Sequence, residues 1–525
     1  MSEETKDEVT QTSEQPAQPE AEQLQSVKKI NKFDKFFGLT ARGTTVSTEI
    51  FAGLTTFLAM AYILTVNPSQ IIGSSELPLW SSVFLATALG AFIGTVLMAL
   101  FAKMPLAQAP GMGLNAAIGG IIGGWSYGMQ FTFGTAMLMV LISGVLFFLL
   151  TVIPCGKDKE TGRLIGIREK IFDSIPKGIR VAIPVGIGLF IAYIGMQNAG
   201  LIVGNIYTQV DLVDFTSWES CKTAVVALVS LLSIGILAHF KVKGAVIIGI
   251  IIATLFAMPI GVANFDIIAG KTDGVTWAFW ENFKNFFSFN TESGGSFFAA
   301  FHDISFPEGS ALTVIVVILS FCMIDMFDTM GTVLGCCSKA NLLDANGKPI
   351  NFNKIMLSDS IATCAGAMLG TSTVTTFVES GTGVAAGGKT GLTALTTSAL
   401  FLLSIFVLPV FAFIPSSAAA GALMYVGVLM MSNVKEIDFS DIRTAIPAFL
   451  TIILMPLAYS ITDGIGIGMI SYVVLNIICY VVDIIKYAVS KKKGGEAVKP
   501  KWPVSIVMGI ITVFFMLYFF LPAQI

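Results

Sequence analysis

The stretch TSTVTTFVESGTGVAAGGKTGL, Thr371 to Leu392, decides how the rest of the chain is interpreted. Its first eight residues are dominated by threonine and valine, whose β-branched side chains favour an extended strand. Glu379 comes next, and the glycine- and alanine-rich residues after it can continue as a short helix. Long apolar segments flank the stretch, and a membrane tolerates interrupted backbone only where protein buries it or a cavity hydrates it. We therefore predict a strand and a half-helix joined at a carboxylate, which is a candidate binding site.

The composition is that of a polytopic membrane protein. Of the 525 residues, 54% are hydrophobic and only 12% are charged, and the mean hydropathy is +0.80. Because no basic block interrupts the chain, nucleic acid is not an expected partner. The seven cysteines have neither metal-ligand nor disulfide spacing, so we expect neither a metal site nor a cofactor. Neither of the two histidines lies in mid-span, so proton chemistry within the bilayer would use carboxylates.

Apolar runs of about 20 residues, the length that crosses the hydrocarbon core, recur along the chain. Two further segments, 104–126 and 371–390, are interrupted, which gives fourteen expected crossings and an all-α polytopic fold. The uninterrupted runs cover 48–66, 80–102, 130–153, 175–197, 222–240, 243–260, 310–336, 355–370, 391–413, 417–432, 442–459 and 465–487.

Arginine and lysine are concentrated in alternate connections. With fourteen crossings, the basic connections 154–180 and 337–354 lie on the same side as the basic residues before the first span. The connections 67–79, 198–218 and 460–464, which carry neither residue, lie on the other side. The positive-inside rule therefore predicts a cytoplasmic N-terminus. We expect a multi-pass protein of the plasma membrane.

These features divide the chain into five parts. We expect a disordered acidic tail, two seven-span halves separated by an aromatic-rich outer connection that lies on the membrane surface, and a basic C-terminal segment. The segment includes an apolar run at 504–521, and the sequence leaves open whether this run crosses the membrane. The tail covers 1–32, the first half 33–260, the outer connection 261–309, the second half 310–487 and the C-terminal segment 488–525.

The first interrupted segment, MPLAQAPGMGLNAAIGGIIGGWS, repeats the pattern of the second. Its GMGLNAA (Gly111 to Ala117) aligns with GTGVAAG (Gly381 to Gly387), which sets Ala109 opposite Glu379. The two segments are third and tenth in the chain, so each is the third of a seven-span half. An odd number of spans per half reverses the orientation of the second half. Paired interrupted segments in inverted halves indicate the substrate site of a transporter.

We single out three acidic side chains within the expected spans. Asp325 and Asp328, three residues apart, share a helix face, and ionisable groups at this depth are rare and functional by default. Two neighbouring carboxylates in a low-dielectric site cannot both ionise easily, so the pair is suited to bind a proton. Glu379 at a half-helix N-terminus is suited to remain charged. The alternatives are helix capping for any one acid and interhelical packing for Asn115.

Three motifs together resemble one transporter family. They are QAPGMGLNA (Gln108 to Ala116), IDMFDTMGT (Ile324 to Thr332) and VESGTGVAAGGKTGLTAL (Val378 to Leu395), and they look like the AzgA-like purine permeases of the nucleobase–cation symporter superfamily. The family shares the uracil-transporter fold. The opening EIFAGLTTFLAMAYILTVNP (Glu49 to Pro68) agrees, and the resemblance extends from about residue 33 to residue 487.

The resemblance implies two inverted seven-span repeats, split into a core and a gate domain, with short strands in segments 3 and 10. It implies that Asn115, Asp325 and Glu379 contact a purine, with Asp328 nearby in a coupling or structural role. We expect the Asp325–Asp328 pair to carry the coupling proton. We add Ala109 and Gly381, which flank the two strand-to-helix joints, to the substrate-binding candidates. Family members are often homodimers that associate through the gate domain.

We therefore expect an importer of adenine, guanine or hypoxanthine rather than an enzyme, driven by a cation gradient. Protons are the expected ion and sodium is the alternative. An anion carrier on the same fold is disfavoured by three intramembrane carboxylates and by the lack of a central Arg or Lys. An intramembrane aspartyl protease would need a Gly-x-Gly-Asp motif, whereas Leu114 and Val384 follow the two Gly-x-Gly sequences.

Overall fold

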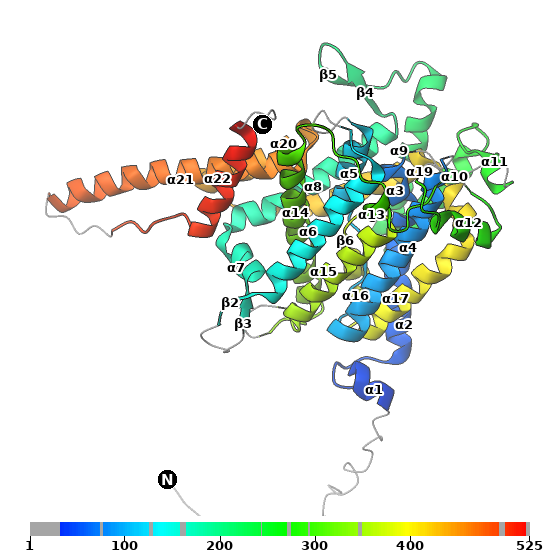
Figure 1. The fold of residues 1–525 in the computed structure, drawn as a ribbon, viewed down its shortest axis with the longest axis horizontal. Coiled ribbons are helices and arrows are strands. Elements are labelled where there is room, and N and C mark those ends of the chain that lie inside the picture. Colours follow the sequence, from blue (N-terminus) through cyan, green and yellow to red (C-terminus); the bar gives the residue numbers. More distant parts are fainter. Residues whose placement is uncertain are drawn as a thin grey trace, which may run out of the picture.

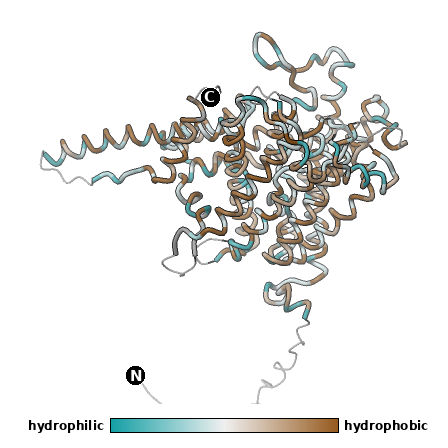
Figure 2. Tube along the Cα trace, in the orientation of Figure 1, coloured by the Kyte–Doolittle hydropathy of each residue, from teal (hydrophilic) through white to brown (hydrophobic). Residues whose placement is uncertain are grey.

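The computed structural model describes residues 32–73, 77–124, 130–157, 164–242, 244–269, 275–291, 294–344, 349–492 and 499–520. The expected disorder of the acidic tail at 1–32 therefore falls, but for Lys32, outside the described residues. Helices dominate, and their apolar residues run through the middle of the bundle while hydrophilic residues gather at its ends (Figures 1 and 2).

The first half of the chain opens with helices that are bent or interrupted. Helices α2 and α3 meet at Ala61 and Tyr62, and a single π-helical turn, Met98–Ala102, ends α4. The elements are α1 (Lys32–Phe37), α2 (Val46–Met60), α3 (Ile63–Ile71), α4 (Pro78–Leu97), β1 (Gln108–Pro110), α5 (Met112–Gly123), α6 (Phe133–Val152), β2 (Pro154–Lys157), β3 (Leu164–Gly166), α7 (Ile167–Ser174), α8 (Lys177–Asn198), β4 (Ile202–Asn205), β5 (Gln209–Leu212), α9 (Trp218–His239) and α10 (Ala245–Ala257).

The second half begins with three short helices and then repeats the order of long helix, strand and half-helix. Its elements are α11 (Phe265–Ile268), α12 (Phe279–Phe286), α13 (Ala299–His302), α14 (Ala311–Lys339), α15 (Phe352–Leu369), β6 (Val374–Thr376), α16 (Ser380–Ala385), α17 (Gly391–Ser404), α18 (Leu408–Ala412), α19 (Ser416–Met431), α20 (Ile442–Leu457), α21 (Ile461–Lys492) and α22 (Ile506–Phe520).

Nine helical stretches among the described residues are long and apolar enough to cross a membrane. Shorter apolar helices add to them at Met112–Gly123, Ala245–Ala257, Ile442–Leu457 and Ile506–Leu517. The chain is thus a multi-pass membrane protein, as its composition predicts. The number of crossings, fourteen, stays a prediction, because several expected spans are helices shorter than the ~20 residues that crossing requires.

The helices pack in two groups. Helices α2 to α6 and α14 to α18 contact one another and form what we call the core group. Helices α8, α9, α10, α19, α20 and α21 form the gate group, in which α8 packs closely against α19 and α20. Within the gate group, Gly188 and Gly427 lie against the facing helix, since a Cβ on either would clash there. This arrangement agrees with the core and gate domains that the resemblance implies.

The two interrupted segments meet in a two-stranded antiparallel sheet. Strand β1 pairs with β6 so that Ala109 lies opposite Thr375, and both strands are fully buried. The bond from Gly111 N to Thr373 O, at 2.8 Å, extends the ladder beyond the three paired residues. The prediction of a strand followed by a half-helix is confirmed in both segments. The second strand is shorter than the eight residues expected, because Thr371 N bonds to Gly366 O at the end of α15.

A buried carboxylate at Glu49, which the sequence analysis did not single out, fixes the far end of the second interrupted segment. Glu49 lies on α2 with no exposed surface. Its carboxylate accepts hydrogen bonds from the backbone N–H groups of Lys389, Thr390 and Thr393, at 2.9 to 3.2 Å, and from the hydroxyls of both threonines. A negative charge is favourable at this position, because the N-terminus of α17 presents unpaired N–H donors.

The apolar run near the C-terminus forms helix α22. It packs against the start of α21, where a Cβ on Gly466 would clash with Phe515, and Ser505 bonds to Ser174 O of α7 at 3.3 Å. The last part of α21 extends away from the bundle (Figure 1). In the aromatic-rich connection, α12 packs on α4, and Phe279 stacks on Phe406 with ring centroids 4.8 Å apart.

We expect the substitution Glu49→Ala to lower the free energy of unfolding by about 3 kcal/mol. Hydrogen bonds to a charged group contribute about 1.5–3 kcal/mol, and here several N–H donors lose their partner together. Ser47→Ala, an exposed position on the same helix, is the matched control. Thermal unfolding of both variants in detergent checks this, and equal midpoints would show that the Glu49 carboxylate is not an anchor.

Candidate functional site

A small cavity lies where the two helix groups meet. The core group contributes α5, α14 and the joint between β6 and α16, and the gate group contributes α8 and α19. Its volume is about 30 Å³, room for little more than one water molecule. The lining residues are Met112, Gly113, Ile187, Ile191, Asp328, Thr332, Thr376, Phe377, Val378, Glu379, Val426 and Met430.

Glu379 is the carboxylate at the joint between strand and half-helix, as predicted. It occupies the N-cap position of α16 and is 5% exposed. The phenol of Tyr62, at the bend between α2 and α3, donates a hydrogen bond to Glu379 Oε1 at 2.7 Å. The same hydroxyl lies 3.5 Å from Met112 Sδ. Tyr62 therefore holds one carboxylate oxygen in place, and this orients the group at the edge of the cavity.

The structure separates the two aspartates of α14. Asp328 lines the cavity together with Glu379. Asp325 is absent from the lining and accepts a hydrogen bond from Thr363 of α15 through Oδ2, at 2.9 Å. Its Oδ1 is buried and has no hydrogen-bond partner in the part of the chain that the structure describes. The spacing predicted that the two aspartates share a helix face. In the structure, Asp328 lines the cavity, whereas Asp325 is directed into the core group.

Behind the cavity lies a buried cluster around Asp359 that the sequence analysis missed. Asp359 Oδ1 accepts from Gln108 Nε2 of β1 at 2.8 Å and from Thr329 Oγ1 of α14 at 2.9 Å. Its Oδ2 lies 3.7 Å from Arg168 Nη2. The signal was available, since Asp359 is an ionisable residue within the expected span 355–370.

Arg168, the cationic partner of Asp359, was also not predicted to be buried. The sequence places it in a basic connection, but the structure buries its side chain to 2% exposure, with the guanidinium 3.6 Å from the centre of the Phe147 ring. A buried cation needs a buried anion nearby, and Asp359 provides it. A count of basic residues in a connection does not distinguish a buried arginine from a solvated one.

The remaining candidates lie beside the cavity rather than in its lining. Asn115 is fully buried on α5 and accepts a hydrogen bond from the Ser372 hydroxyl, which suits the packing interpretation. Ala109 lies in β1 opposite Thr375, so the residue at the helix-start position equivalent to Glu379 is Gly111. Gly381 follows the joint in α16, next to Cys336. Across the described residues, no group of three His, Cys, Asp or Glu side chains is placed to hold a metal ion.

The fold occurs in solved structures of transporters. The transmembrane domain of the cyanobacterial bicarbonate transporter BicA aligns with a TM-score of 0.54 at 15% sequence identity, covering 79% of this chain and 97% of the other. The murine anion transporter Slc26a9, in its inward-facing state, gives a TM-score of 0.52 at 11% identity and covers 89% and 74%. At these identities the likeness establishes the fold alone.

Sequence relatives then identify the family. Residues 47–467 match the Permease family of xanthine/uracil permeases, and the chain belongs to it. A putative permease of Methanocaldococcus jannaschii is 38% identical, covering 85% of this chain and 92% of its own length. The adenine permease AdeQ of Escherichia coli is 36% identical (84% and 90%), and the guanine/hypoxanthine permease PbuO of Bacillus subtilis is 37% identical (84% and 94%). The resemblance seen in the motifs is confirmed.

The cluster around Asp359 yields a testable prediction. We expect Asp359→Ala to destabilise the protein by about 3–5 kcal/mol, because it leaves the Arg168 charge buried without its partner. The double variant Asp359→Ala/Arg168→Met should recover part of that loss, since it removes both charges together. Thermal unfolding of the two single variants and the double variant measures the coupling. Losses that simply add would contradict an interaction between the two side chains.

Proposed function

We propose that this permease imports purine nucleobases by symport with a cation, most simply a proton, through alternating access. The observation that carries the proposal is that Glu379 and Asp328 line one cavity between the core and gate groups. The relatives of the chain include adenine and guanine/hypoxanthine permeases. Two carboxylates accept hydrogen bonds and have no donor of their own when charged, so they suit the N–H edge of a base.

The geometry suggests how a purine would be recognised. Glu379, oriented by Tyr62, would accept N1–H of hypoxanthine, or both N1–H and the 2-amino group of guanine. Met112 and Gly113, which begin α5, also line the cavity, and the first N–H groups of a helix have no partner within it. These donors would suit the 6-oxo group. We therefore expect oxopurines to bind better than adenine, whose N1 is an acceptor.

The cavity volume supports alternating access. At about 30 Å³ the cavity is far below the ~300–1,000 Å³ of most small-molecule sites. Within each helix group, glycines allow close contacts, such as Gly427 against Ala192 in the gate group and Gly383 against Thr56 in the core group. Contacts this close favour movement of each group as a unit. A purine would enter when the gate group moves away from the core group.

An anion carrier on the same fold remains the alternative. The two structural relatives are named as bicarbonate and anion transporters, which says nothing of the substrate of this chain. The cavity lining contains two carboxylates and, among the described residues, neither lysine nor arginine. Such a lining repels a small anion, so we retain the nucleobase as the proposed substrate.

Glu379→Gln tests substrate recognition. The variant keeps the shape of the side chain but replaces an acceptor oxygen with a donor. The loss of a charge-assisted hydrogen bond costs about 1.5–3 kcal/mol, so we expect KM to rise roughly ten- to hundredfold. Uptake of labelled hypoxanthine in cells without their own purine transport measures this, with the exposed Glu436→Gln as the matched control. A wild-type KM in protein that reaches the membrane would remove Glu379 from the site.

Asp328→Asn tests the coupling. Asp328 cannot carry a proton as the amide, so we expect purine binding and base-for-base exchange to persist in vesicles while uptake loses its response to an imposed pH gradient. Asp325→Asn, one helical turn away, shows which of the two aspartates carries the proton. If Asp328→Asn still accumulates purine in proportion to the gradient, the proton is carried elsewhere and Glu379 is the next candidate.

A further inference from the structure

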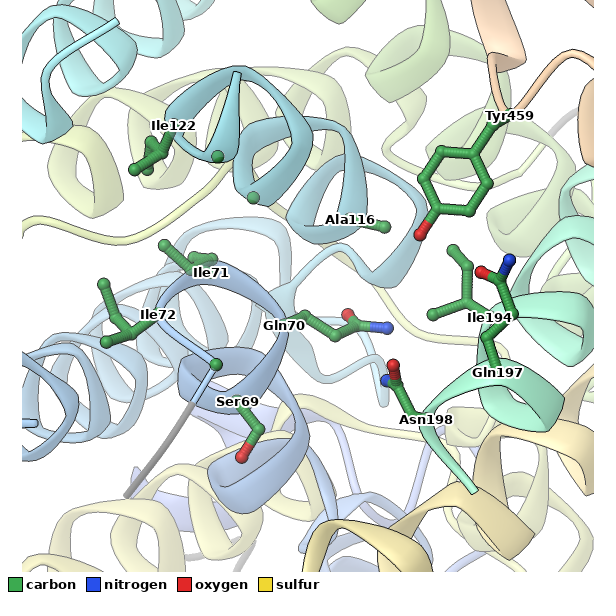
Figure 3. A pocket seen from close by; sticks show the side chains of 13 residues that line it. Ser69, Gln70, Ile71, Ile72, Ala116, Ile122, Ile194, Gln197, Asn198 and Tyr459 are labelled. Atoms are coloured by element: carbon green, nitrogen blue, oxygen red, sulfur yellow. The ribbon is translucent and has the colours of Figure 1, made fainter. Parts of the chain in front are cut away.

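A second, larger cavity lies at the end of the interface between the core and gate groups (Figure 3). The end of α3, helix α5, the end of α8 and the connection between α20 and α21 surround it. Its volume is about 730 Å³, within the ~300–1,000 Å³ range of small-molecule sites. We call it the vestibule. It opens at the connections that the arginine and lysine distribution assigns to the outer side of the membrane.

The side chain of Gln70 projects into the vestibule without a partner. Both polar atoms of its amide are buried and lack a hydrogen-bond partner among the described residues. Figure 3 shows the amide directed toward Tyr459 and Asn198 across the cavity. The backbone of Gln70 is held firmly, because Gly119 of α5 packs against its carbonyl so closely that a Cβ would clash. An unpaired buried amide is costly, and a ligand in the cavity would satisfy it.

The other lining residues define the chemistry of that ligand. Gln197 and Asn198 add two more amides, and the lining, as far as the structure describes it, contains no Asp, Glu, Lys or Arg. Tyr459 supplies an aromatic ring, held against Phe190 with ring centroids 5.3 Å apart. Its φ of +51° is uncommon for a residue other than glycine, and such backbone is concentrated at functional sites. Amides that pair with base edges, together with an aromatic ring for stacking, match a neutral planar heterocycle.

The vestibule and the inner cavity share two helices. On α5, Met112 and Gly113 line the inner cavity and Ala116 lines the vestibule. On α8, Ile191 lines the inner cavity and Ile194 the vestibule. These positions are about one helical turn apart, or roughly 5 Å along the helix axis. A ligand in the vestibule would therefore lie directly outside the inner cavity.

We propose that the vestibule is a separate binding site for nucleobases, in which Gln70 pairs with the edge of the base and Tyr459 stacks on its face, so that purines are selected before they reach Glu379. The proposal rests on the proposed function of purine transport. It assigns Gln70 a role in specificity, which the motifs shared with purine permeases do not include.

Equilibrium binding of labelled hypoxanthine to the purified full-length protein tests the proposal in four forms: wild type, Gln70→Leu, Glu379→Gln and the double variant. We expect two binding sites in the wild type and residual vestibule binding in Glu379→Gln. Adding Gln70→Leu to Glu379→Gln should weaken that residual binding roughly three- to tenfold, the effect of one lost hydrogen bond. Gln130→Leu, an exposed glutamine of the connection after α5, is the matched control and should leave binding unchanged.

A second arm separates recognition from packing. Adenine presents an amino donor beside the N7 acceptor, the edge that a glutamine amide pairs with, whereas unsubstituted purine lacks the amino group. Gln70→Leu should weaken adenine binding at least threefold more than purine binding. Equal losses for both ligands, or unchanged residual binding in the double variant, would overturn the vestibule proposal. If the wild type neither binds nor takes up any purine, the proposed function itself fails, and the vestibule proposal with it.

Discussion

The pairing of β1 with β6 is the constraint on which the rest of the structure depends. In hydrocarbon an unpaired backbone N–H or C=O costs several kcal/mol, so a chain interrupted at mid-membrane must find partners within the protein. Each interrupted segment here supplies the partners of the other: Ala109 lies opposite Thr375, and Gly111 N bonds to Thr373 O. Because the two segments are interrupted, the half-helices α5 and α16 both begin at one cavity, which Met112 and Glu379 line.

Polar anchors, more than apolar burial, position this sheet. Lipid is as apolar as leucine, so there is little hydrophobic drive between helices within a membrane, and hydrogen bonds gain relative weight. The Gln108 side chain ties β1 to Asp359 of α15, and the Ser380 hydroxyl accepts a bond from Ala107 N across the two segments at 3.0 Å. Glu49 then holds the end of the second segment to α2. The binding geometry is therefore set by buried polar side chains outside the cavity.

The sequence predicts the interrupted segments well because their signal is local. Threonine and valine favour a strand, glycine and alanine allow close helix packing, and the carboxylate of Glu379 marks the joint. The sequence does not predict the direction of a side chain when that direction depends on a residue far away in the chain. Asp325 turns away from Asp328 because Thr363, on another helix, donates a hydrogen bond to it. Glu49 lies in a helix-forming run, and its role depends on N–H groups some 340 residues later in the chain.

The separation of β1 from β6 has a consequence for biosynthesis. Roughly 260 residues lie between the two strands, and a ribosome adds about 5–20 residues per second. For tens of seconds during synthesis the first half of the protein therefore holds a strand without its partner. A membrane interior offers no water to satisfy that strand, so the insertion machinery must shelter it or delay its entry into lipid until the second half emerges. A chain truncated before β6 would leave the backbone of β1 without its hydrogen-bond partners in the membrane.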